Sequence, residues 1–512
     1  MTMKTRILGR LAAMTAVAVL AGAPMALPAF AQEAAPAVAE APAATPAPVE
    51  AAPAAPAVAE AAAPTITPTV DKGDNAWMML SALLVLLMIV PGLALFYGGL
   101  VRQKNMLSML MQVSTVTVVG MITWALWGYS LAFTDGGSAD LFVGGLSKLF
   151  LKGVDTTTLV GTFSTGVSIP ELTFVSFQMT FACITAALVL GGLAERIKFS
   201  ATVLFAVLWP LIVYYPMAHM VWWWAGPDTV ALNPTAPIQA GLLWSWGALD
   251  FAGGTVVHIN AGIAALVGAL ILGKRTGFQK EPMPPHSLTL TLVGAGLLWV
   301  GWFGFNAGSN LEANAYASLA MINTFLATAA AGFSWTLTEW VTRKKASMLG
   351  MASGLVAGLV AVTPAAGFAG PMGAIILGLI VSPICVIFCS AVKNALKYDD
   401  SLDAFGIHAI GGIVGAIATG FLVNPEWGGA GIVDYTTCAA DGDISTCANA
   451  TYSMGTQVLA QTKAVLFTVA WSGILSSLVF FIIKFTVGLR VSAETEEEGL
   501  DISEHGERAY HT

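Results

Sequence analysis

Two histidines, His258 and His408, lie inside long apolar stretches that carry almost no charge. Both follow the pattern His-x-x-small-Gly-Ile, and they are 150 residues apart. Imidazole can donate and accept hydrogen bonds, exchange a proton or bind a metal ion. A single histidine in a helix is usually an ordinary core residue. A pair in matching sequence positions instead indicates two imidazoles that act together.

Metal binding is one chemistry open to such a pair, and the sequence argues against it. The chain has no His-x-x-x-His or His-Glu-x-x-His spacing, and no cysteine or carboxylate cluster accompanies the histidines. It also has no nucleophile elbow and no phosphate-binding loop. We therefore expect no metal, no cofactor, no catalytic residue and no enzymatic activity. The second interpretation is a hydrogen-bonded imidazole pair that lines an apolar pore for a small neutral solute.

Aromatic residues form a second candidate site. Trp302 and Phe305 lie in the block Gly301–Ser309, and Trp222 ends another apolar stretch. Aromatic faces beside a hydroxyl would suit a small cation through cation–π attraction and one hydrogen bond. An interfacial aromatic belt explains the same residues. Composition favours the belt, and both interpretations remain open at this point.

These residues must be held by membrane helices. The chain has 512 residues, of which 56% are hydrophobic and only 10% charged. This composition excludes a soluble enzyme, a disordered chain and a nucleic-acid binder. A helix needs about 20 apolar residues to cross a bilayer. Ten uncharged stretches are long enough: 75–101, 105–134, 172–194, 199–227, 251–273, 287–311, 313–338, 346–392, 404–425 and 464–483.

The stretch 346–392 is long enough for two spans, with a break from Pro364 to Pro371. The sequence therefore predicts an all-α membrane protein with eleven transmembrane helices. Leu249-Asp250 precedes His258, and Leu402-Asp403 precedes His408, although the Asp-to-His spacing is eight residues in one case and five in the other. We interpret spans 1–5 and 6–10 as an inverted five-helix repeat, followed by an eleventh helix.

The flanking segments predict location and orientation. Residues 1–31 have basic residues, a short apolar run and a small-x-small end, which is typical of a signal peptide. Residues 32–72 form an Ala/Pro-rich leader, 73–490 the eleven-span domain and 491–512 a tail. Lys and Arg concentrate in every second connection, which places the mature N-terminus in the periplasm and the C-terminus in the cytoplasm. The expected outer segments contain few basic residues: Lys72, Lys148, Lys152 and Lys463.

Several motifs follow one another along the spans and into the tail: Pro91–Leu100, Phe181–Thr185, Ala194–Arg196, Ala218–Trp222, Asp250–Asn260, Gly301–Ser309 and Phe405–His408, and in the tail Gly499–Asp501, His505–Glu507 and Ala509–Tyr510. With these motifs the chain resembles the Amt/Mep/Rh family of ammonium transporters over roughly residues 71–512. The resemblance rests on the joint order of several motifs along the spans. Trp223 and Trp224 depart from it, because small residues would be usual there.

The resemblance implies a role for each matching residue. Trp222 and Ser309 would recruit ammonium at the outer face, with Phe181 beside them. Phe181 and Phe305 would stack as a gate below that site. The remaining residues would line or support the path of ammonia: Trp302 along the path, Asp250 behind the recruitment site, and His258 and His408 as the paired pore imidazoles.

The resemblance also implies partners. Members of the family are homotrimers with one pore in each subunit, and bacterial members are typically blocked at the cytoplasmic face by a PII-type signalling protein. We therefore expect an inner-membrane protein that binds ammonium or ammonia and no nucleic acid. The physical difficulty is selectivity against potassium, which matches ammonium in size and charge. Only ammonium can lose a proton, so deprotonation in the path would discriminate between the two ions. An ammonium sensor remains a rival hypothesis.

Two cysteines predict a disulfide. Cys438 and Cys447 lie in the segment 426–462, which the charge bias places outside the cytoplasm. Their surroundings are small and polar, so a loop is expected, and thiols at this spacing can meet in a turn. We predict a disulfide between them. The other three cysteines lie in apolar spans and should stay reduced: Cys183, Cys385 and Cys389.

Overall fold

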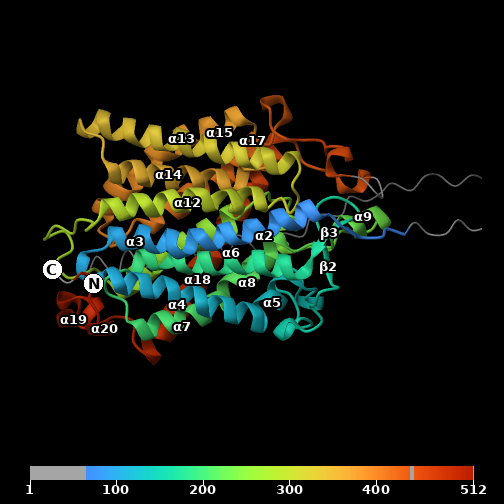
Figure 1. Cartoon of the computed structure of the whole chain (residues 1–512). Helices are drawn as coiled ribbons and strands as arrows, with labels where there is room; N and C mark the ends of the chain where they lie inside the picture. The colour runs from blue at the N-terminus through green and yellow to red at the C-terminus, as the bar shows by residue number, and fades with distance from the viewer. Residues whose placement is uncertain (1–64, 439–442, 511–512) are drawn as a thin grey trace, which may run out of the picture. The chain divides into compact units, whose positions relative to one another are not determined.

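Long apolar helices dominate the computed structural model of the chain (Figure 1). The structure describes residues 65–438 and 443–510, so the expected signal peptide and most of the expected leader lie outside the described residues. Within the described ranges, eleven helices are long and apolar enough to cross a membrane. The predicted number of spans is thereby confirmed. Inside a bilayer an α-helix satisfies its backbone polar groups within one segment, so each long apolar stretch forms one.

The first five spans run over Lys72–Leu100, Gln103–Phe133, Glu171–Leu193, Phe199–Trp222 and Gly254–Leu272. Most are divided by a short π-helical segment, so one span often carries two labels. Their α-helices are α2 (Lys72–Leu87), α3 (Ala94–Leu100), α4 (Met106–Thr123), α5 (Tyr129–Phe133), α6 (Glu171–Leu193), α7 (Phe199–Trp209), α8 (Tyr215–Trp222) and α11 (Asn260–Leu272).

The last six spans run over Leu288–Gly308, Ala315–Arg343, Met348–Ala365, Pro371–Leu396, Phe405–Leu422 and Met454–Thr486. The predicted break between Pro364 and Pro371 therefore separates two spans. The α-helices are α12 (Leu288–Gly308), α13 (Ala315–Arg343), α14 (Met348–Val362), α15 (Pro371–Ile387), α16 (Lys393–Leu396), α17 (Ile410–Leu422) and α18 (Met454–Thr486).

Span 11 begins earlier than the sequence indicated. Lys463 was expected in an outer connection, but it lies inside α18. Its ammonium group sits 3.6 Å from the ring centroid of Trp246, so an aromatic face compensates the charge. Lys463 is exposed on the surface of α18, and an exposed lysine can keep its charged group close to water, which is why a charge-based boundary was wrong here.

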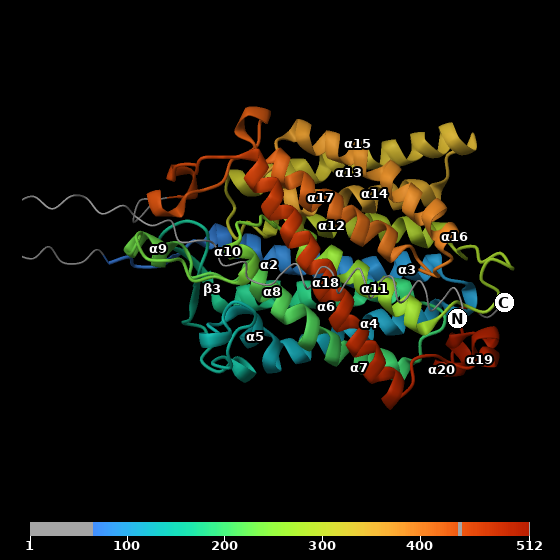
Figure 2. The ribbon, with the colours of Figure 1, turned by 180° about the vertical axis from the view of Figure 1, so that it is seen from behind.

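The two ends of the bundle differ. We call one the tail end, because α19 (Ala493–Glu498) and α20 (Leu500–His505) lie there with the C-terminus (Figures 1 and 2). We call the other the loop end. It holds the long connections 134–170, 223–253, 423–438 and 443–453. It also contains α9 (Pro227–Leu232), α10 (Leu242–Ser245) and the strands β1 (Thr69–Val70), β2 (Leu159–Gly161) and β3 (Val167–Pro170).

The small sheet has the order β1-β3-β2, with β1 parallel and β2 antiparallel to β3. Thr69 pairs with Val167, so the last residues of the expected leader are tied to the bundle. The helical core is centred on α6, which packs against α2, α4 and α11. α11 in turn packs against α18 and against the π-helical segment Phe405–Ala409 that begins span 10. These contacts bring the two histidine-bearing spans together.

Candidate functional site

The two histidines meet in the interior of the bundle. Nδ1 of His258 lies 3.3 Å from Nδ1 of His408, and the rings are nearly parallel, with an interplanar angle of 17°. Both side chains are buried. Each lies in a π-helical segment that begins its span, Gly254–Ile259 in one case and Phe405–Ala409 in the other. The matched positions in the sequence therefore become matched positions in space.

The glycine of the shared motif explains how the helices come so close. A Cβ on Gly262, one turn after His258, would lie 2.3 Å from the backbone nitrogen of Ala409. A Cβ on Gly412, one turn after His408, would lie 3.0 Å from the carbonyl oxygen of Gly254 and 3.1 Å from Cβ of His258. Each glycine thus lets the partner span approach at the level of the imidazoles.

A bond between two Nδ1 atoms fixes the tautomers when both rings are neutral. One Nδ1 must carry the proton and the other must accept it, so the accepting ring is protonated on Nε2. Nε2 of His258 has no hydrogen-bond partner within the described part of the chain. His258 thus keeps one ring nitrogen available for a further hydrogen bond.

The histidines line a small inner cavity of about 10 Å³. A cavity of this size holds about one water molecule. Trp302 and Phe305 also line it, and the rest of its wall is aliphatic or aromatic. Trp302 stacks on His258 with centroids 5.4 Å apart, and its indole nitrogen donates to the hydroxyl of Thr363 at 2.9 Å. The cavity can hold a small neutral molecule, whereas a bare ion would lose its hydration.

Two phenylalanine rings lie between this cavity and a cleft at the loop end. Phe181 and Phe305 stack with centroids 4.2 Å apart and an interplanar angle of 12°. Phe305 lines the inner cavity, and Phe181 lines the cleft. Both side chains are almost fully buried. The stacked pair is thus positioned to close the route between the two spaces.

The cleft at the loop end is far larger, with a volume of about 940 Å³. Trp222 and Ser309 line it beside Phe181, and Trp222 meets the Phe181 ring edge-on at 5.8 Å. The Ser309 hydroxyl donates to the carbonyl of Phe305 at 2.7 Å, which leaves its oxygen lone pairs free to accept. The cleft is therefore lined by an indole that contacts Phe181 and by a hydroxyl bonded to the backbone of Phe305.

Asp250 holds the start of span 5 rather than facing the cleft with a free charge. Its carboxylate accepts hydrogen bonds from the backbone nitrogens of Gly253, Gly254 and Thr255 at 2.8, 2.5 and 2.8 Å. Its carbonyl oxygen accepts the indole N–H of Trp222 at 3.1 Å. One residue thus fixes both the helix that carries the first histidine and the tryptophan that contacts Phe181.

The counterpart of Asp250 in the second half is Asp400, and the sequence pairing with Asp403 was wrong. The Asp400 carboxylate accepts from the backbone nitrogens of residues 404–406 at the start of span 10. Asp400 precedes its histidine by eight residues, as Asp250 does. Asp403 instead forms an ion pair with Lys393 at 2.7 Å. Burial raises the pKa of Asp400 to about 6, although Lys393 counteracts this effect.

Sequence reasoning missed Gln178. It lies one helical turn before Phe181 on α6, it lines the cleft and it is only 8% exposed. Its Oε1 has no hydrogen-bond partner in the described residues. A buried carboxamide oxygen without a partner costs free energy unless a donor reaches it. The signal in the sequence was a lone glutamine three residues before the first gate residue.

Comparison with known proteins identifies the family. The sequence model of the Ammonium Transporter Family matches residues 76–510. The chain belongs to the ammonium transporter family. The protein named "Ammonium transporter" of Aquifex aeolicus is 44% identical over 445 residues, which are 86% of this chain and 94% of that protein.

Solved structures agree with the family. Mep2 of Saccharomyces cerevisiae is similar with a TM-score of 0.71 and 31% identity, over 84% of this chain and 93% of that one. A structure named "Sensor Amt Protein" is similar with a TM-score of 0.71 and 26% identity, over 85% of this chain and 98% of that one.

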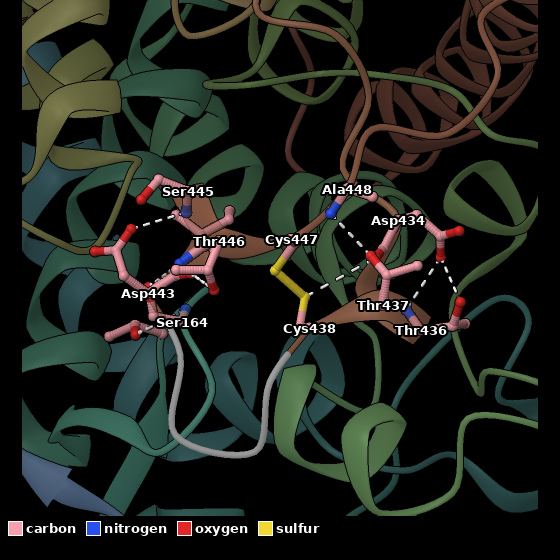
Figure 3. Close-up of a disulfide and its surroundings, with 12 residues drawn as sticks. Ser164, Asp434, Thr436, Thr437, Cys438, Asp443, Ser445, Thr446, Cys447 and Ala448 are labelled. Carbon is pink, nitrogen blue, oxygen red and sulfur yellow. Dashed lines mark hydrogen bonds between the residues drawn. A yellow bond between two sulfur atoms is a disulfide. The ribbon is translucent and has the colours of Figure 1, made fainter.

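At the loop end of this ammonium transporter family member, a disulfide joins Cys438 to Cys447, with Cα atoms 4.4 Å apart (Figure 3). Residues from other connections also hold this loop by hydrogen bonds. The backbone nitrogen of Ile444 donates to the hydroxyl of Ser164 at 2.9 Å, and Ser164 donates to the buried carboxylate of Glu312 at 2.8 Å. Ile444 lines the cleft, so the closed loop forms part of its wall.

The additional tryptophans also shape this wall. Trp223 stacks on His219 with centroids 4.9 Å apart. Trp224 stacks on Trp244 at 5.4 Å and contacts Tyr435 at 4.7 Å. The departures from the family pattern therefore pack the connection 223–253 against α8, against itself and against the connection 423–438, and Trp222 still contacts Phe181.

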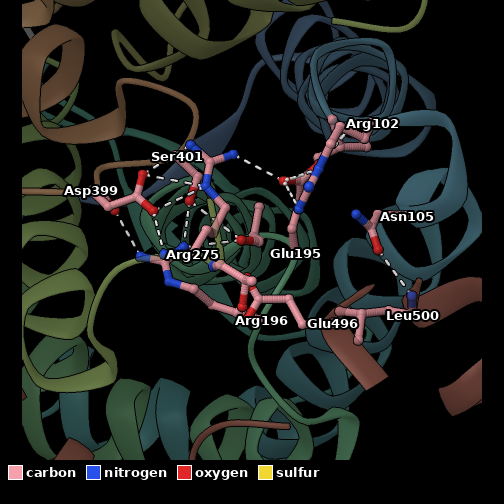
Figure 4. Close-up of polar contacts among 12 residues, drawn as sticks. Arg102, Asn105, Glu195, Arg196, Arg275, Asp399, Ser401, Glu496 and Leu500 are labelled. Atoms are coloured by element: carbon pink, nitrogen blue, oxygen red, sulfur yellow. Dashed lines mark hydrogen bonds and ion pairs between the residues drawn. The ribbon is translucent and has the colours of Figure 1, made fainter. Parts of the chain in front are cut away.

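At the tail end, buried charges bind the connections to one another (Figure 4). Arg275 forms ion pairs with Glu195 at 3.0 Å and with Asp399 at 2.8 Å, and Arg102 pairs with Glu195 at 2.9 Å. Burial would raise the pKa of Glu195, but Arg275 and Arg102 outweigh it and hold that pKa below its usual value. Burial would likewise raise the pKa of Asp399, but Arg196 and Arg275 outweigh it and hold that pKa below its usual value.

The tail itself is packed onto this cluster. The carboxylate of Glu496 accepts from the backbone nitrogen of Thr276 at 2.7 Å and pairs with Arg490 at 2.6 Å. The backbone nitrogen of Leu500 donates to the side chain of Asn105 at 2.9 Å (Figure 4). The tail is thus joined to the connections that begin or end spans 2, 5 and 11.

Proposed function

We propose that this chain transports ammonium across a membrane by recruiting it at the loop end, removing its proton and conducting ammonia past the histidine pair. The supporting observation is the order of three features: an aromatic cleft, a stacked phenylalanine pair and an apolar cavity with two imidazoles 3.3 Å apart. The family and the printed names of its relatives support ammonium as the substrate.

Recruitment would take place above the gate. The indole of Trp222 offers a cation–π face, and the oxygen of Ser309 and the unpartnered Oε1 of Gln178 offer acceptors. Ammonium has four N–H donors, so several acceptors around an aromatic face suit it. Potassium can use the aromatic face but makes no directed hydrogen bonds, so the site already favours ammonium.

Deprotonation would complete the selection. An ion that left the cleft would have to enter a cavity of about 10 Å³ with mostly apolar walls. The cost of this transfer in free energy is prohibitive for an unpaired charge, whereas neutral ammonia gives up little free energy of hydration. Ammonium can leave its proton behind and potassium cannot. The gate rings, Phe181 and Phe305, would part only for the neutral molecule.

The histidine pair would serve ammonia as donor and acceptor inside the cavity. The proton has two possible routes, and they differ in the charge that is moved. If it returns to the loop end, transport is neutral. If it crosses through the imidazole pair, each ammonia is accompanied by one charge. Simultaneous measurement of uptake and current in proteoliposomes separates the two routes.

We further propose an inner-membrane location, with the loop end in the periplasm and the tail end in the cytoplasm. The basic residues around the tail end support this orientation, since positive charge favours the cytoplasmic side. Residues 1–31 would then be a cleaved signal peptide. The family resemblance supports a homotrimer and a PII-type protein that binds at the tail end, and mass measurement of the purified complex with and without that protein tests both.

The deciding experiment replaces the imidazoles. His258→Ala and His408→Ala should each insert normally and should each lower ammonium uptake by proteoliposomes or change its selectivity over potassium. His286→Ala, a histidine at the tail end outside the inner cavity, is the control and should behave as wild type. Wild-type uptake and wild-type selectivity in both pore variants would remove the histidines from the mechanism.

Sensing is the second candidate function, because one similar structure is named a sensor. A sensor that does not transport would bind ammonium without moving it. Proteoliposome uptake by the wild-type chain therefore distinguishes the two functions. Ammonium binding without any uptake would favour the sensor.

A further inference from the structure

A side chain on span 11 holds the backbone segment that precedes Asp250. The carboxamide of Gln461 accepts a hydrogen bond from the backbone nitrogen of Leu249 at 2.6 Å and donates one to the carbonyl of the same residue at 2.8 Å. The side chain thus pairs with Leu249 as a neighbouring strand would. Its second N–H donates to the carbonyl of Ala416 on α17 at 2.8 Å. Gln461 is only 1% exposed.

A second glutamine supports the first. Gln457 lies one turn earlier on α18, and its Nε2 donates to the carbonyl of Gly247 at 2.8 Å and to Oε1 of Gln461 at 3.3 Å. Two glutamines on one helix face therefore bind alternate residues of the segment 247–249. The segment has no regular secondary structure of its own to hold it there.

The position of this segment matters because it leads directly into Asp250. The carbonyl of Asp250 receives the indole N–H of Trp222, and its carboxylate caps the helix that carries His258. Ala416 lies about two turns beyond His408 in the same span. One buried carboxamide therefore connects the segment before the first histidine to the helix behind the second.

We infer that Gln461 is a positioning residue for ammonium recruitment: it fixes the segment 247–250, and through Asp250 it sets the indole of Trp222 above the gate. This inference rests on the proposed function. Loss of the carboxamide would remove both of its hydrogen bonds to the half-buried backbone of Leu249, which is unfavourable. Leu249 also lines the cleft, so the segment has room to move toward it.

The chemistry of the site is specific to glutamine. Glutamate keeps the acceptor but lacks both donors, and it would bury a charge. Asparagine has the same groups on a chain that is one methylene shorter. Methionine conserves the volume and removes every hydrogen bond, so Gln461→Met isolates the polar contribution. Thr462→Val is the matched control, because among the described residues the hydroxyl of Thr462 bonds within its own helix, to the carbonyl of Val458 at 2.8 Å.

The test combines transport with hydrogen exchange. In Gln461→Met proteoliposomes we expect KM for ammonium about tenfold higher, the factor that corresponds to about 1.4 kcal/mol, with a maximal rate close to that of wild type. We also expect faster amide exchange in the peptide covering residues 247–256 and unchanged exchange elsewhere. Thr462→Val should match wild type in both measurements, and Gln457→Met should show a smaller change in the same direction.

Two results would overturn the inference. One is an unchanged KM or unchanged exchange at residues 247–256 in Gln461→Met. The other is faster exchange throughout the bundle with a fall in maximal rate, which would indicate general destabilisation. Hydrogen exchange needs no substrate, so it tests the contact independently of transport. Absence of ammonium uptake by the wild-type chain would instead overturn the proposed function.

Discussion

Gly262→Ala tests whether the close approach of spans 5 and 10 creates the histidine pair. The new Cβ would lie 2.3 Å from the backbone nitrogen and 2.7 Å from Cβ of Ala409. Comfortable contacts between such atoms begin at about 3.5 Å, so the two spans must separate by roughly 1 Å. The imidazoles lie one turn away, with Nδ1 atoms 3.3 Å apart. The same separation would carry that distance beyond about 4 Å, where no hydrogen bond remains.

The expected result is a large functional loss with a moderate loss of stability. Overpacking of this kind costs about 1–3 kcal/mol, which a protein of this size can tolerate. We expect ammonium uptake by Gly262→Ala proteoliposomes to fall at least about tenfold, while thermal unfolding of the purified protein still shows a folded bundle at a lower Tm. In the proposed mechanism ammonia passes the imidazole pair after recruitment, so the loss should appear in the maximal rate of transport rather than in the affinity of recruitment.

Two further glycines provide a graded comparison. A Cβ on Gly412 would meet its nearest neighbours at 3.0 Å, so Gly412→Ala should lower uptake less than Gly262→Ala does. A Cβ on Gly296 has no described atom within 4 Å, so Gly296→Ala should transport as wild type and be slightly more stable, because alanine favours the helix. Equal uptake by Gly262→Ala and Gly296→Ala would refute the reasoning.

The remaining predictions concern the gate, the loop and the tail end. Phe305→Ala should open the route between the cleft and the inner cavity, and water permeation through proteoliposomes should rise relative to wild type. Thiol labelling of the denatured, non-reduced protein should modify Cys183, Cys385 and Cys389 and leave Cys438 and Cys447 unmodified. Five labelled cysteines would contradict the disulfide. The pKa of Glu195 is lowered by its arginine partners, so its contribution to stability is present at neutral pH and is lost as the pH falls below about 4. Glu195→Gln should therefore lower Tm at pH 7 and flatten the acid dependence of Tm, whereas an unchanged acid dependence would count against this role.

The sequence by itself determined the spans. A bilayer accepts only apolar segments whose backbone bonds are internal, so the number of spans and the break near Pro364 follow from composition along the chain. The sequence also identified His258 and His408. A polar residue within an apolar stretch can be recognised from the sequence, whatever the helix packs against. The start of span 11 was misplaced because a charge was taken as a boundary. Lys463 lies inside the helix, where its ammonium group contacts the ring of Trp246. The sequence alone does not show that contact.

Only the tertiary structure decided which residues act together. The repeat pattern paired Asp250 with Asp403, because a shared dipeptide is visible in sequence, whereas the backbone nitrogens at each helix start show that Asp400 is the counterpart. Gln178 and Gln461 carried no sequence signal strong enough to assign them roles. Their importance depends on the depth and rotation of α6 and α18, which are set by packing against other helices. Helix crossing angles and close approaches arise from contacts between residues far apart in the chain, and local periodicity does not record them.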